Sequence, residues 1–461
     1  MYSIEEVMAS KNMAVFGASR DAEKPGAVLL KLLKDTGFQG KVAGVNPRGG
    51  DMHGFTFYRK LDDVPFSVDL AVMLIPPQAV PAALNDCAQR GVKGAVISSE
   101  GFAEVGAEGM QYQIEVRKIL RTSGMRGFGP NTLGIVNTAT GLTTSYIANE
   151  RTLKPGPIGF VAQSGIFVGG LLRYLSSFNG LQLSKGLGLG NKVDVDESDA
   201  LTYLMEDEAT RIIGMYLEDI REGKQFLEVA RRAVLQKPVI LLKGGRTPLG
   251  ARSTASHTAS LAMDDGVVSG ALQQVGVLRV AGIDDFMGTL MGFRWMPLPK
   301  GGQIALVTYS GAQAIMSIDA ATELGVGLAS LQAKTREKLS SIISSASKTR
   351  NPVDMFPDMI AHGFEKTTTK ILRALLEDEG VHGIIFISFA RSTGEDFLPH
   401  VEIIHECKKK PVFFSLIGIQ EEVEANRAFL EGHGIPFYLF PEMGIRVFAN
   451  MWRYAAMLEH A

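Results

Sequence analysis

The segments "NMAVFGAS" (residues 12–19) and "GAVLLKLLKDTG" (residues 26–37) decide the fold class of this chain. The first is a short apolar run that ends in a glycine turn, which predicts a buried strand. The second has the apolar spacing of an amphipathic helix that ends at Gly37. A strand, a glycine turn and a helix in this order predict the first unit of a parallel α/β sheet.

Three more runs of strand length follow, separated by helical stretches such as residues 78–91. Strands that alternate with helices predict a doubly wound parallel sheet, in which ligands bind beyond the carboxyl ends of the strands. The three runs are KVAGVNP (41–47), VDLAVMLIPP (68–77) and VKGAVISSEGF (92–102). The candidate ligand loops are therefore Gly17-Ala18-Ser19-Arg20, Asn46-Pro47-Arg48, Ile75-Pro76-Pro77 and Ser98-Ser99-Glu100.

Two later segments, residues 156–172 and 304–318, both read as a strand, Ser-Gly and a helix. Three further blocks recur in the same order after each of them, which indicates an internal duplication. The pairs are NKVDVD (191–196) with NPVDMF (351–356), LMEDEATRIIGMYLED (204–219) with LLEDEGVHGIIFISFA (375–390), and KPVILL (237–242) with KPVFFS (410–415). The alignment sets Glu218 opposite Phe389, so we expect Glu218 to serve chemistry and not the fold.

The 461 residues predict three domains at roughly 150 residues each. We place them at residues 1–150, 151–296 and 303–461, with the linker MPLPKGG (296–302) between the last two. A hydrophobic content of 46% and a net charge of −2 are those of a globular protein without bulk attraction to nucleic acid or anionic membranes. Two cysteines make no disulfide framework, and neither a signal peptide nor a spanning apolar run is evident, so we expect a cytoplasmic protein.

The glycine turn at Gly17 favours a phosphate, because backbone N–H groups and a helix dipole both attract anions. It is not a G-x-G-x-x-G motif, since the next glycine after Gly17 is Gly26. An NAD site also requires an acidic residue at the end of the second strand, where this chain has Asn46-Pro47-Arg48. A cation there suits a ribose that carries a phosphate, as in NADP or coenzyme A. Ordinary strand-end turns are the alternative.

The segment "KGGRTPLGARSTASHTASLA" (243–262) places His257 among small polar residues. No His, Cys or carboxylate lies near it before Asp264, and no G-x-S-x-G elbow is present, so neither a metal site nor a serine triad is predicted. The chemical role that remains is a nucleophile that accepts a phosphoryl group, with Glu218 as the first candidate to orient the ring. A surface-loop histidine without function is the alternative.

Many motifs, in the same order along nearly the whole chain, resemble those of one family. They are VFGAS, VNPRGG, ISSEGFAE, GPNTLGIVN, VAQSG, GLGNKVDVDESDALTYLMED, MYLED, KPVILLKGGRT and GARSTASHTASLA. Together they resemble the α subunit of the ADP-forming acyl-CoA (acetyl-CoA) synthetases, relatives of succinyl-CoA synthetase. The resemblance implies an N-terminal Rossmann-like CoA-binding domain followed by two flavodoxin-like domains. It also implies a separate ATP-grasp β subunit that binds ADP or ATP with Mg, in an α2β2 assembly.

The resemblance implies that acyl-CoA, phosphate and ADP are converted into a carboxylate, CoA and ATP. His257 then matches the phosphorylated histidine, Glu218 the carboxylate that holds its ring, and Ser164 with Gly165 the phosphate cradle. The CoA contacts fall on Gly17, Ala18, Ser19, Arg20, Asn46, Pro47, Arg48, Pro76, Ser98, Ser99, Glu100 and Asn131. Ala259 and Ala312 depart from glycines of the family pattern, which leaves their effect on substrate range open.

Two other functions remain open at this point: a CoA-sensing protein without a catalytic partner, and an NADP-dependent oxidoreductase. The second is weakened by the altered glycine pattern and gives His257 no role. The resemblance implies that His257 visits two sites, and the small polar residues around it predict a mobile segment. Lys243, Arg246 and Arg252 are available to neutralise a phosphate. The acyl group of the substrate is not predicted.

Overall fold

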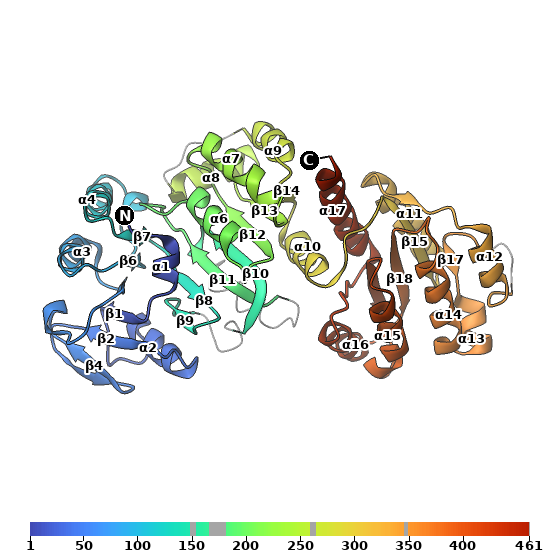
Figure 1. Cartoon of the computed structure of the whole chain (residues 1–461), viewed down its shortest axis with the longest axis horizontal. Helices are drawn as coiled ribbons and strands as arrows, with labels where there is room; N and C mark the ends of the chain where they lie inside the picture. Colours follow the sequence, from blue (N-terminus) through green and yellow to red (C-terminus); the bar gives the residue numbers. More distant parts are fainter. Residues whose placement is uncertain (148–153, 166–180, 259–263, 345–348, 461) are drawn as a thin grey trace. The chain divides into compact units, whose positions relative to one another are not determined.

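The computed structural model describes residues 1–147, 154–165, 181–258, 264–344 and 349–460, without the side chains of residues 254–258. Its contacts divide the chain into two compact units, of which the first ends at Ala281 and the second begins at Gly282. The first unit contains two seven-stranded sheets, and the second unit contains one five-stranded sheet (Figure 1).

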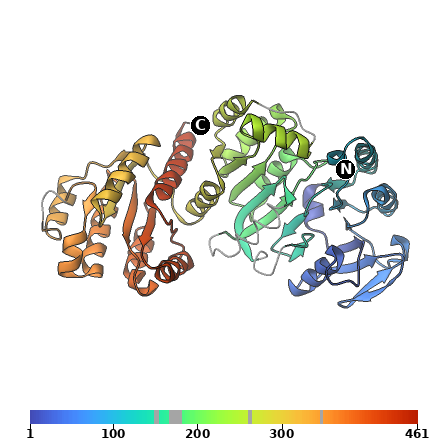
Figure 2. The same ribbon diagram turned by 180° about the vertical axis from the view of Figure 1, so that it is seen from behind.

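The first sheet has the strand order β3-β4-β2-β1-β5-β6-β7 and is parallel apart from β3. Its strands are β1 (Asn12–Phe16), β2 (Lys41–Val45), β3 (Gly50–Met52), β4 (Phe55–Tyr58), β5 (Leu70–Met73), β6 (Gly94–Ile97) and β7 (Arg126–Phe128). The helices are α1 (Ile4–Met8), α2 (Pro25–Asp35), α3 (Val80–Gln89) and α4 (Ala107–Ser123), with short 3-10 turns η1 (Leu61–Asp63), η2 (Pro77–Ala79) and η3 (Ala103–Val105). The helices α3 and α4 lie side by side (Figures 1 and 2).

The predicted strands and the predicted first helix are confirmed. The apolar runs of the sequence form strands that the parallel sheet buries on both faces. The β3–β4 hairpin was not predicted. Its turn has positive φ angles at His53 and Gly54, and Phe57 is the one buried residue of its two short strands. A hairpin with so little buried apolar surface gives only a weak sequence signal.

The second sheet has the order β14-β13-β12-β10-β11-β8-β9. Its strands are β8 (Ile135–Asn137), β9 (Leu142–Thr143), β10 (Pro155–Ala162), β11 (Leu183–Gly188), β12 (Ile212–Leu217), β13 (Val239–Lys243) and β14 (Leu278–Val280), with helices α6 (Glu197–Glu206), α7 (Gly223–Val234), α8 (Pro248–Thr258) and α9 (Asp265–Gln274). β8 and β9 precede the domain boundary predicted at residue 150, yet β8 pairs with β11 of this sheet. The chain therefore passes from the first sheet to the second before residue 150. The domain limits themselves stay a prediction.

The third sheet has the order β16-β15-β18-β19, with β17 also paired to β15. Its strands are β15 (Gln303–Thr308), β16 (Gly327–Leu328), β17 (Val353–Asp354), β18 (Gly383–Phe389) and β19 (Val412–Ile417). Its helices are α10 (Ile283–Trp295), α11 (Gly311–Glu323), α12 (Ala333–Ser340), α13 (Phe356–His362), α14 (Phe364–Leu376), α15 (Leu398–Cys407), α16 (Gln420–Gly432) and α17 (Pro441–Glu459), with the 3-10 turn η7 (Gly394–Phe397).

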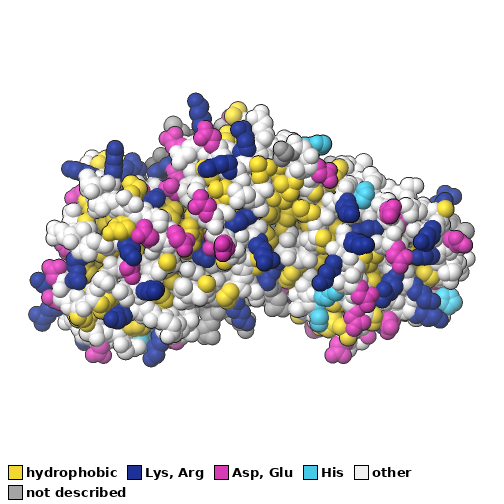
Figure 3. Space-filling model, in the orientation of Figure 1, with side chains coloured by type: hydrophobic (Ala, Val, Ile, Leu, Met, Phe, Trp, Pro, Cys, Tyr) yellow, Lys and Arg dark blue, Asp and Glu magenta, His cyan; other side chains and the backbone are white. Residues whose placement is uncertain are grey.

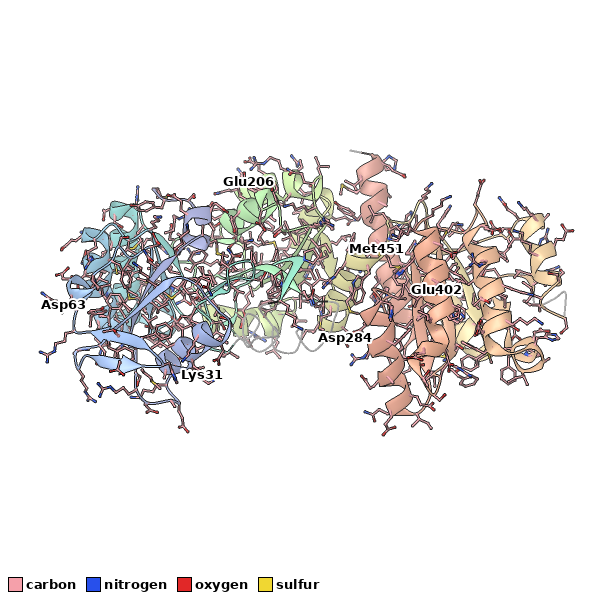
Figure 4. The ribbon with its side chains drawn as sticks, turned by 60° about the horizontal axis from the view of Figure 1, so that its bottom comes forward. Lys31, Asp63, Glu206, Asp284, Glu402 and Met451 are labelled. Atoms are coloured by element: carbon pink, nitrogen blue, oxygen red, sulfur yellow. The ribbon has the colours of Figure 1, made fainter. Side chains whose placement is uncertain are left out.

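The helix α10, which the sequence assigned to the second domain, packs against α17 in the second unit. The amide of Asn450 on α17 donates to the Asp285 carboxylate over 3.1 Å and to the Thr289 hydroxyl over 2.9 Å. The labelled side chains Asp284 and Met451 mark these two helices in Figure 4.

The strand order confirms the internal duplication. β13-β12-β10-β11 in the second sheet corresponds to β19-β18-β15-β16 in the third. The register agrees as well, because Val161 pairs with Met215 in one copy and Val307 pairs with Phe386 at the matching place in the other. The sequence alignment that sets residue 218 opposite residue 389 is therefore the structural alignment.

Each copy also has a partly buried lysine that binds backbone carbonyls at the end of an earlier helix, α6 in the second sheet and α14 in the third. Lys237 donates to Leu204 and Asp207 in the second sheet, and Lys410 donates to Leu375 and Asp378 in the third. This lysine belongs to the shared architecture, since it recurs where the loop chemistry differs.

Candidate functional site

The loops after β1 and β2 are joined at the carboxyl edge of the first sheet. The Asn46 amide donates to the carbonyl of Ala18 over 2.7 Å, and the Arg48 backbone N–H donates to the Asn46 side chain over 2.9 Å. β2 and β5 flank β1 on opposite sides, which makes this edge the switch point where α/β sheets bind ligands. The side chains of Arg20 and Arg48 are exposed there.

Gly17 brings the β1 loop unusually close to the β5 loop. Its φ is +86°, and a Cβ atom at this position would lie 2.1 Å from the carbonyl oxygen of Leu74. A Cβ on Gly26, in the first turn of α2, would lie 2.4 Å from the Gly17 carbonyl oxygen. Both glycines are therefore required by the close backbone packing of this turn at the edge of the sheet.

The loops after β5 and β6 supply the remaining predicted CoA contacts. Pro76 and Glu100 are exposed, and the Ser99 hydroxyl donates to the carbonyls of Met73 and Ile75. Ser98 is buried, and its hydroxyl has no hydrogen-bond partner within the described part of the chain. Buried hydroxyl groups are normally paired, so the Ser98 hydroxyl is a group that a bound ligand can satisfy.

A cavity of about 270 Å³ joins the edges of the two sheets in the first unit. It brings together six of the predicted site residues: Ser98, Glu100, Asn131, Ser164, Gly165 and Glu218. Its other lining residues are Thr132, Leu133, Tyr146, Ile147, Gln163, Gly190 and Asn191. The predicted loop residues Gly17 to Arg20 and Asn46 to Arg48, with Pro76 and Ser99, do not line this cavity and lie at other positions along the edge of the first sheet.

Glu218 is the first residue after β12, and neighbouring groups hold both its backbone and its side chain. The Glu218 backbone N–H donates to Gln163 Oε1 over 2.8 Å, and the Tyr216 hydroxyl donates to Glu218 Oε1 over 3.2 Å. Burial and the Glu218 carboxylate together raise the pKa of Tyr216, so this hydroxyl stays protonated and remains a donor. The carboxylate therefore has a fixed direction at the wall of the cavity.

Lys243 corrects one expectation from the sequence. It is only 6% exposed, and its ammonium donates to the backbone carbonyls of Glu218 over 2.6 Å and Gly244 over 2.5 Å. Burial lowers its pKa. The Lys243 ammonium is thus bound to the loop that carries Glu218. It is not an exposed cation that could neutralise a phosphate. Arg246 and Arg252 are exposed, as expected.

The backbone of His257 belongs to α8, so the predicted loop is a helix as far as Thr258. The Thr247 hydroxyl accepts the backbone N–H of Gly250 over 3.1 Å, and Pro248 occupies the first helical position, which together start this helix. α8 lies against η3, which follows the Ser98–Glu100 loop. The His257 side chain and Ala259 lie outside the described part of the structure.

The third sheet has different residues at the equivalent edge. Phe389, opposite Glu218, is 39% exposed and stacks on Tyr309 with a ring-centroid distance of 3.8 Å. Ala312, the second departure from the family pattern, lies in the first turn of α11. The polar groups around Glu218 are thus specific to the second sheet.

Sequence reasoning missed four residues that surround the Glu218 loop: Gln163, Lys192, Glu197 and Asp219. The only sequence signal was that all four fall inside the quoted family motifs. Among the described residues, no group of three or more His, Cys, Asp or Glu side chains is arranged to hold a metal ion. None of the described helices is long and apolar enough to span a membrane. Basic and acidic side chains are interspersed on the face shown in Figure 3.

Comparisons with known proteins show which family this chain resembles along its length. Residues 11–138 match the model of a CoA binding domain, and residues 155–293 match that of the succinyl-CoA ligase like flavodoxin domain. ADP-forming acetate–CoA ligase II of Archaeoglobus fulgidus is 36% identical over 98% of this chain, which spans 67% of that protein. The alpha subunit of ADP-forming acetate–CoA ligase II of Pyrococcus furiosus is 35% identical, with 94% of this chain and 93% of the subunit covered.

Among solved structures, a dinucleotide forming acetyl-coenzyme A synthetase 1 from Ca. Korarchaeum cryptofilum, in complex with phosphate and ADP, superposes with a TM-score of 0.91. It is 29% identical, and the match covers 100% of this chain and 98% of that chain. The similarity therefore extends through all three sheets.

Proposed function

This chain belongs to the ADP-forming acetate–CoA ligase family, and from that premise we propose that it converts an acyl-CoA and phosphate into a carboxylate and free CoA, while the phosphoryl group passes through His257 to ADP. One observation carries this proposal. The cavity sets Glu218 and the Ser164–Gly165 turn of the second sheet beside Ser98 and Asn131 of the first.

The residues at the edge of the first sheet fit coenzyme A. The turn at Gly17 presents backbone N–H groups to a phosphate, Arg48 adds a positive charge at the end of β2, and the buried Ser98 hydroxyl offers an unused hydrogen bond. Bound as the thioester, CoA supplies the thiolate leaving group. The loops of the first sheet then direct the acyl end towards Asn131 and the cavity.

In the first chemical step, phosphate attacks the thioester carbonyl. A C–O bond forms, the C–S bond breaks, and CoA leaves as the thiolate, which gives an acyl phosphate. Ser164 and Gly165, which follow β10 after Gln163, bind the phosphate oxygens at the cavity wall. Fixed donors around the reacting phosphate stabilise the charge that develops in the transition state.

In the second step, the neutral imidazole of His257 attacks phosphorus. An N–P bond forms, the P–O bond to the acyl group breaks, and the carboxylate leaves. Glu218 accepts the hydrogen bond from the other ring N–H and stabilises the positive charge on the ring. The phosphoryl group then passes to ADP, which regenerates the free histidine.

ADP and its Mg belong on a partner with an ATP-grasp fold. Two of the relatives are named as alpha subunits, which supports a partner chain, and we propose an α2β2 assembly. The relatives are named as ligases, so neither the NADP-dependent oxidoreductase nor the catalytically silent CoA sensor is retained. The acyl group is a small-molecule carboxylate whose identity an acyl-CoA panel would establish.

The test is phosphorylation of the chain in complex with its partner subunit, using acetyl-CoA and radiolabelled phosphate. Wild type should give an acid-labile, base-stable label, and His257→Ala should abolish the label and ATP formation while CoA binding remains. Glu218→Gln should slow labelling by roughly 10³–10⁴-fold, as for other carboxylates that orient a histidine. Phe389→Leu, at the duplicate position, is the control and should label normally. Full labelling of His257→Ala would refute the proposal.

A further inference from the structure

Lys192 and Glu197 form a fully buried ion pair near the site. The Lys192 side chain is 1% exposed, and its φ of +53° is unusual for a residue with a side chain. The ammonium lies 2.8 Å from Glu197 Oε2, 2.5 Å from Asp219 Oδ1 and 3.0 Å from the Asp219 carbonyl oxygen. A buried charge is retained only when it is paired in this way, so the three acceptors define the position of the ammonium.

The pairing reaches Glu218 through one side-chain amide. Asp219 Oδ1, which Lys192 contacts, also accepts a hydrogen bond from Gln163 Nε2 over 2.6 Å. A carboxylate can only accept, so this bond fixes which end of the amide faces Asp219. Gln163 Oε1 must then point the other way, where it accepts the backbone N–H groups of Glu218 over 2.8 Å and Asp219 over 3.1 Å.

The loop after β12 closes back on Lys192 through Arg221. The Arg221 backbone N–H donates to Glu197 Oε1 over 2.6 Å, and its guanidinium donates to the carbonyl of Asn191 over 2.8 Å and to that of Lys192. The carboxylate of Glu197 is thus shared between the ammonium and the loop. Two positive and two negative side chains balance one another in this cluster, which consists of Lys192, Glu197, Asp219 and Arg221.

The duplicate sheet shows that the fold itself does not need this arrangement. The aligned residues are Tyr309 for Gln163, Pro352 for Lys192, Phe389 for Glu218 and Ala390 for Asp219. The strands keep their order and register without the ammonium, the carboxylate or the amide. The cluster therefore occurs in the copy that contains Glu218 and not in the other. Burying its charged groups costs desolvation free energy, and this cost is explained by a role in the site.

We propose that Lys192 is a positioning residue for phosphoryl transfer, which acts through Asp219 and Gln163 to hold Glu218 in the direction that receives the His257 ring. This inference rests on the proposed function. Lys192 itself touches neither substrate nor histidine. Its ammonium holds the Asp219 carboxylate in place, Asp219 orients the Gln163 amide, and the amide holds the backbone of Glu218 at the end of β12.

The experiment compares Lys192→Met with Lys237→Met in the complex with the partner subunit. Lys237 is a fair control, because its ammonium also binds two backbone carbonyls in the same unit but takes no part in the Glu218 loop. Two rates are measured with acetyl-CoA and radiolabelled phosphate: release of the CoA thiol and appearance of label on His257. Lys192→Met should slow labelling about 100-fold, the effect of a displacement of about 1 Å, with the KM for acetyl-CoA within about threefold. Lys237→Met should change neither rate.

Asp219→Asn keeps the volume of the side chain and serves if Lys192→Met does not fold. It should slow labelling to a similar degree, and the double variant should be no slower than the slower single variant, because the two residues act in one chain of contacts. Equal slowing of thiol release and labelling, or additive effects in the double variant, would overturn the positioning role. Persistence of label in His257→Ala would refute the proposed function instead, so the two failures are distinguishable.

Discussion

Replacement of Gly17 by alanine tests whether the close approach of two loops builds the CoA site. Two costs apply: a side chain at φ +86°, about 1–2 kcal/mol, and a Cβ atom 2.1 Å from the backbone oxygen of Leu74. Real Cβ atoms keep at least 3.0 Å from such atoms, so the ends of β1 and β5 must separate by about 1 Å, at a further cost of about 1–3 kcal/mol. We expect a total loss of about 2–5 kcal/mol in local stability. Gly37→Ala is the matched control, since its φ is +73° but nothing lies within 4 Å of the added Cβ.

Native-state hydrogen exchange of the β1 and β5 amides measures the local opening free energies, and calorimetry measures CoA affinity. Gly17→Ala should lower both, because the displaced loop no longer presents its N–H groups to the phosphate. Gly37→Ala should lose only the conformational cost and bind CoA as wild type does. If both variants lost the same stability and kept the same affinity, the close approach would have no part in the site.

Three further predictions follow from the described side chains. Arg48→Glu should weaken CoA binding about 10- to 100-fold in calorimetry, because a charge-assisted bond to a phosphate is replaced by repulsion; an unchanged Kd would exclude that contact. Burial raises the pKa of the Cys87 thiol to about 12, so under native conditions a thiol reagent at pH 8 should label the partly exposed Cys407 and reach Cys87 only after unfolding. Burial also raises the pKa of Glu431 from 4.5 to about 7, so the folded chain retains a proton that the unfolded chain releases, and stability is lost as pH rises from 4.5 to 7. Glu431→Gln should therefore raise the melting temperature of the second unit at pH 8 and leave it unchanged at pH 4; equal shifts at both would contradict this pKa.

The central strands, the helix that follows the first strand and the internal duplication could all be predicted from the sequence. Each of these features depends on a local period or on a repeated order of blocks, which a sequence displays directly. Glu218 could be selected for the same reason, because the duplicate has Phe389 at that position. In the structure, one cavity is lined by six of the predicted site residues, which come from two sheets.

The cluster around Lys192 could not be predicted, because the burial of an ammonium depends on acceptors that are distant in the chain. Glu197 is five residues away and Asp219 is twenty-seven, and nothing in the local pattern distinguishes Lys192 from an exposed lysine. Lys243 was misjudged for the same reason, since its acceptor Glu218 is brought to it only by the pairing of β12 with β13. The helical state of α8 was missed because small polar residues give no apolar period.

The path of the chain between the first two sheets has a thermodynamic consequence. Asn137, in β8 of the second sheet, donates its amide to the carbonyl of Met8 over 2.9 Å, at the end of the helix that precedes β1. The segment that follows the first sheet is thus a strand of the second sheet, between β11 and β9, and also holds the start of the chain. Opening either sheet breaks contacts of the other, so the two should unfold as one cooperative block. Saturation of the first sheet with CoA should then slow amide exchange in β13 and β14 of the second sheet as well, by linkage.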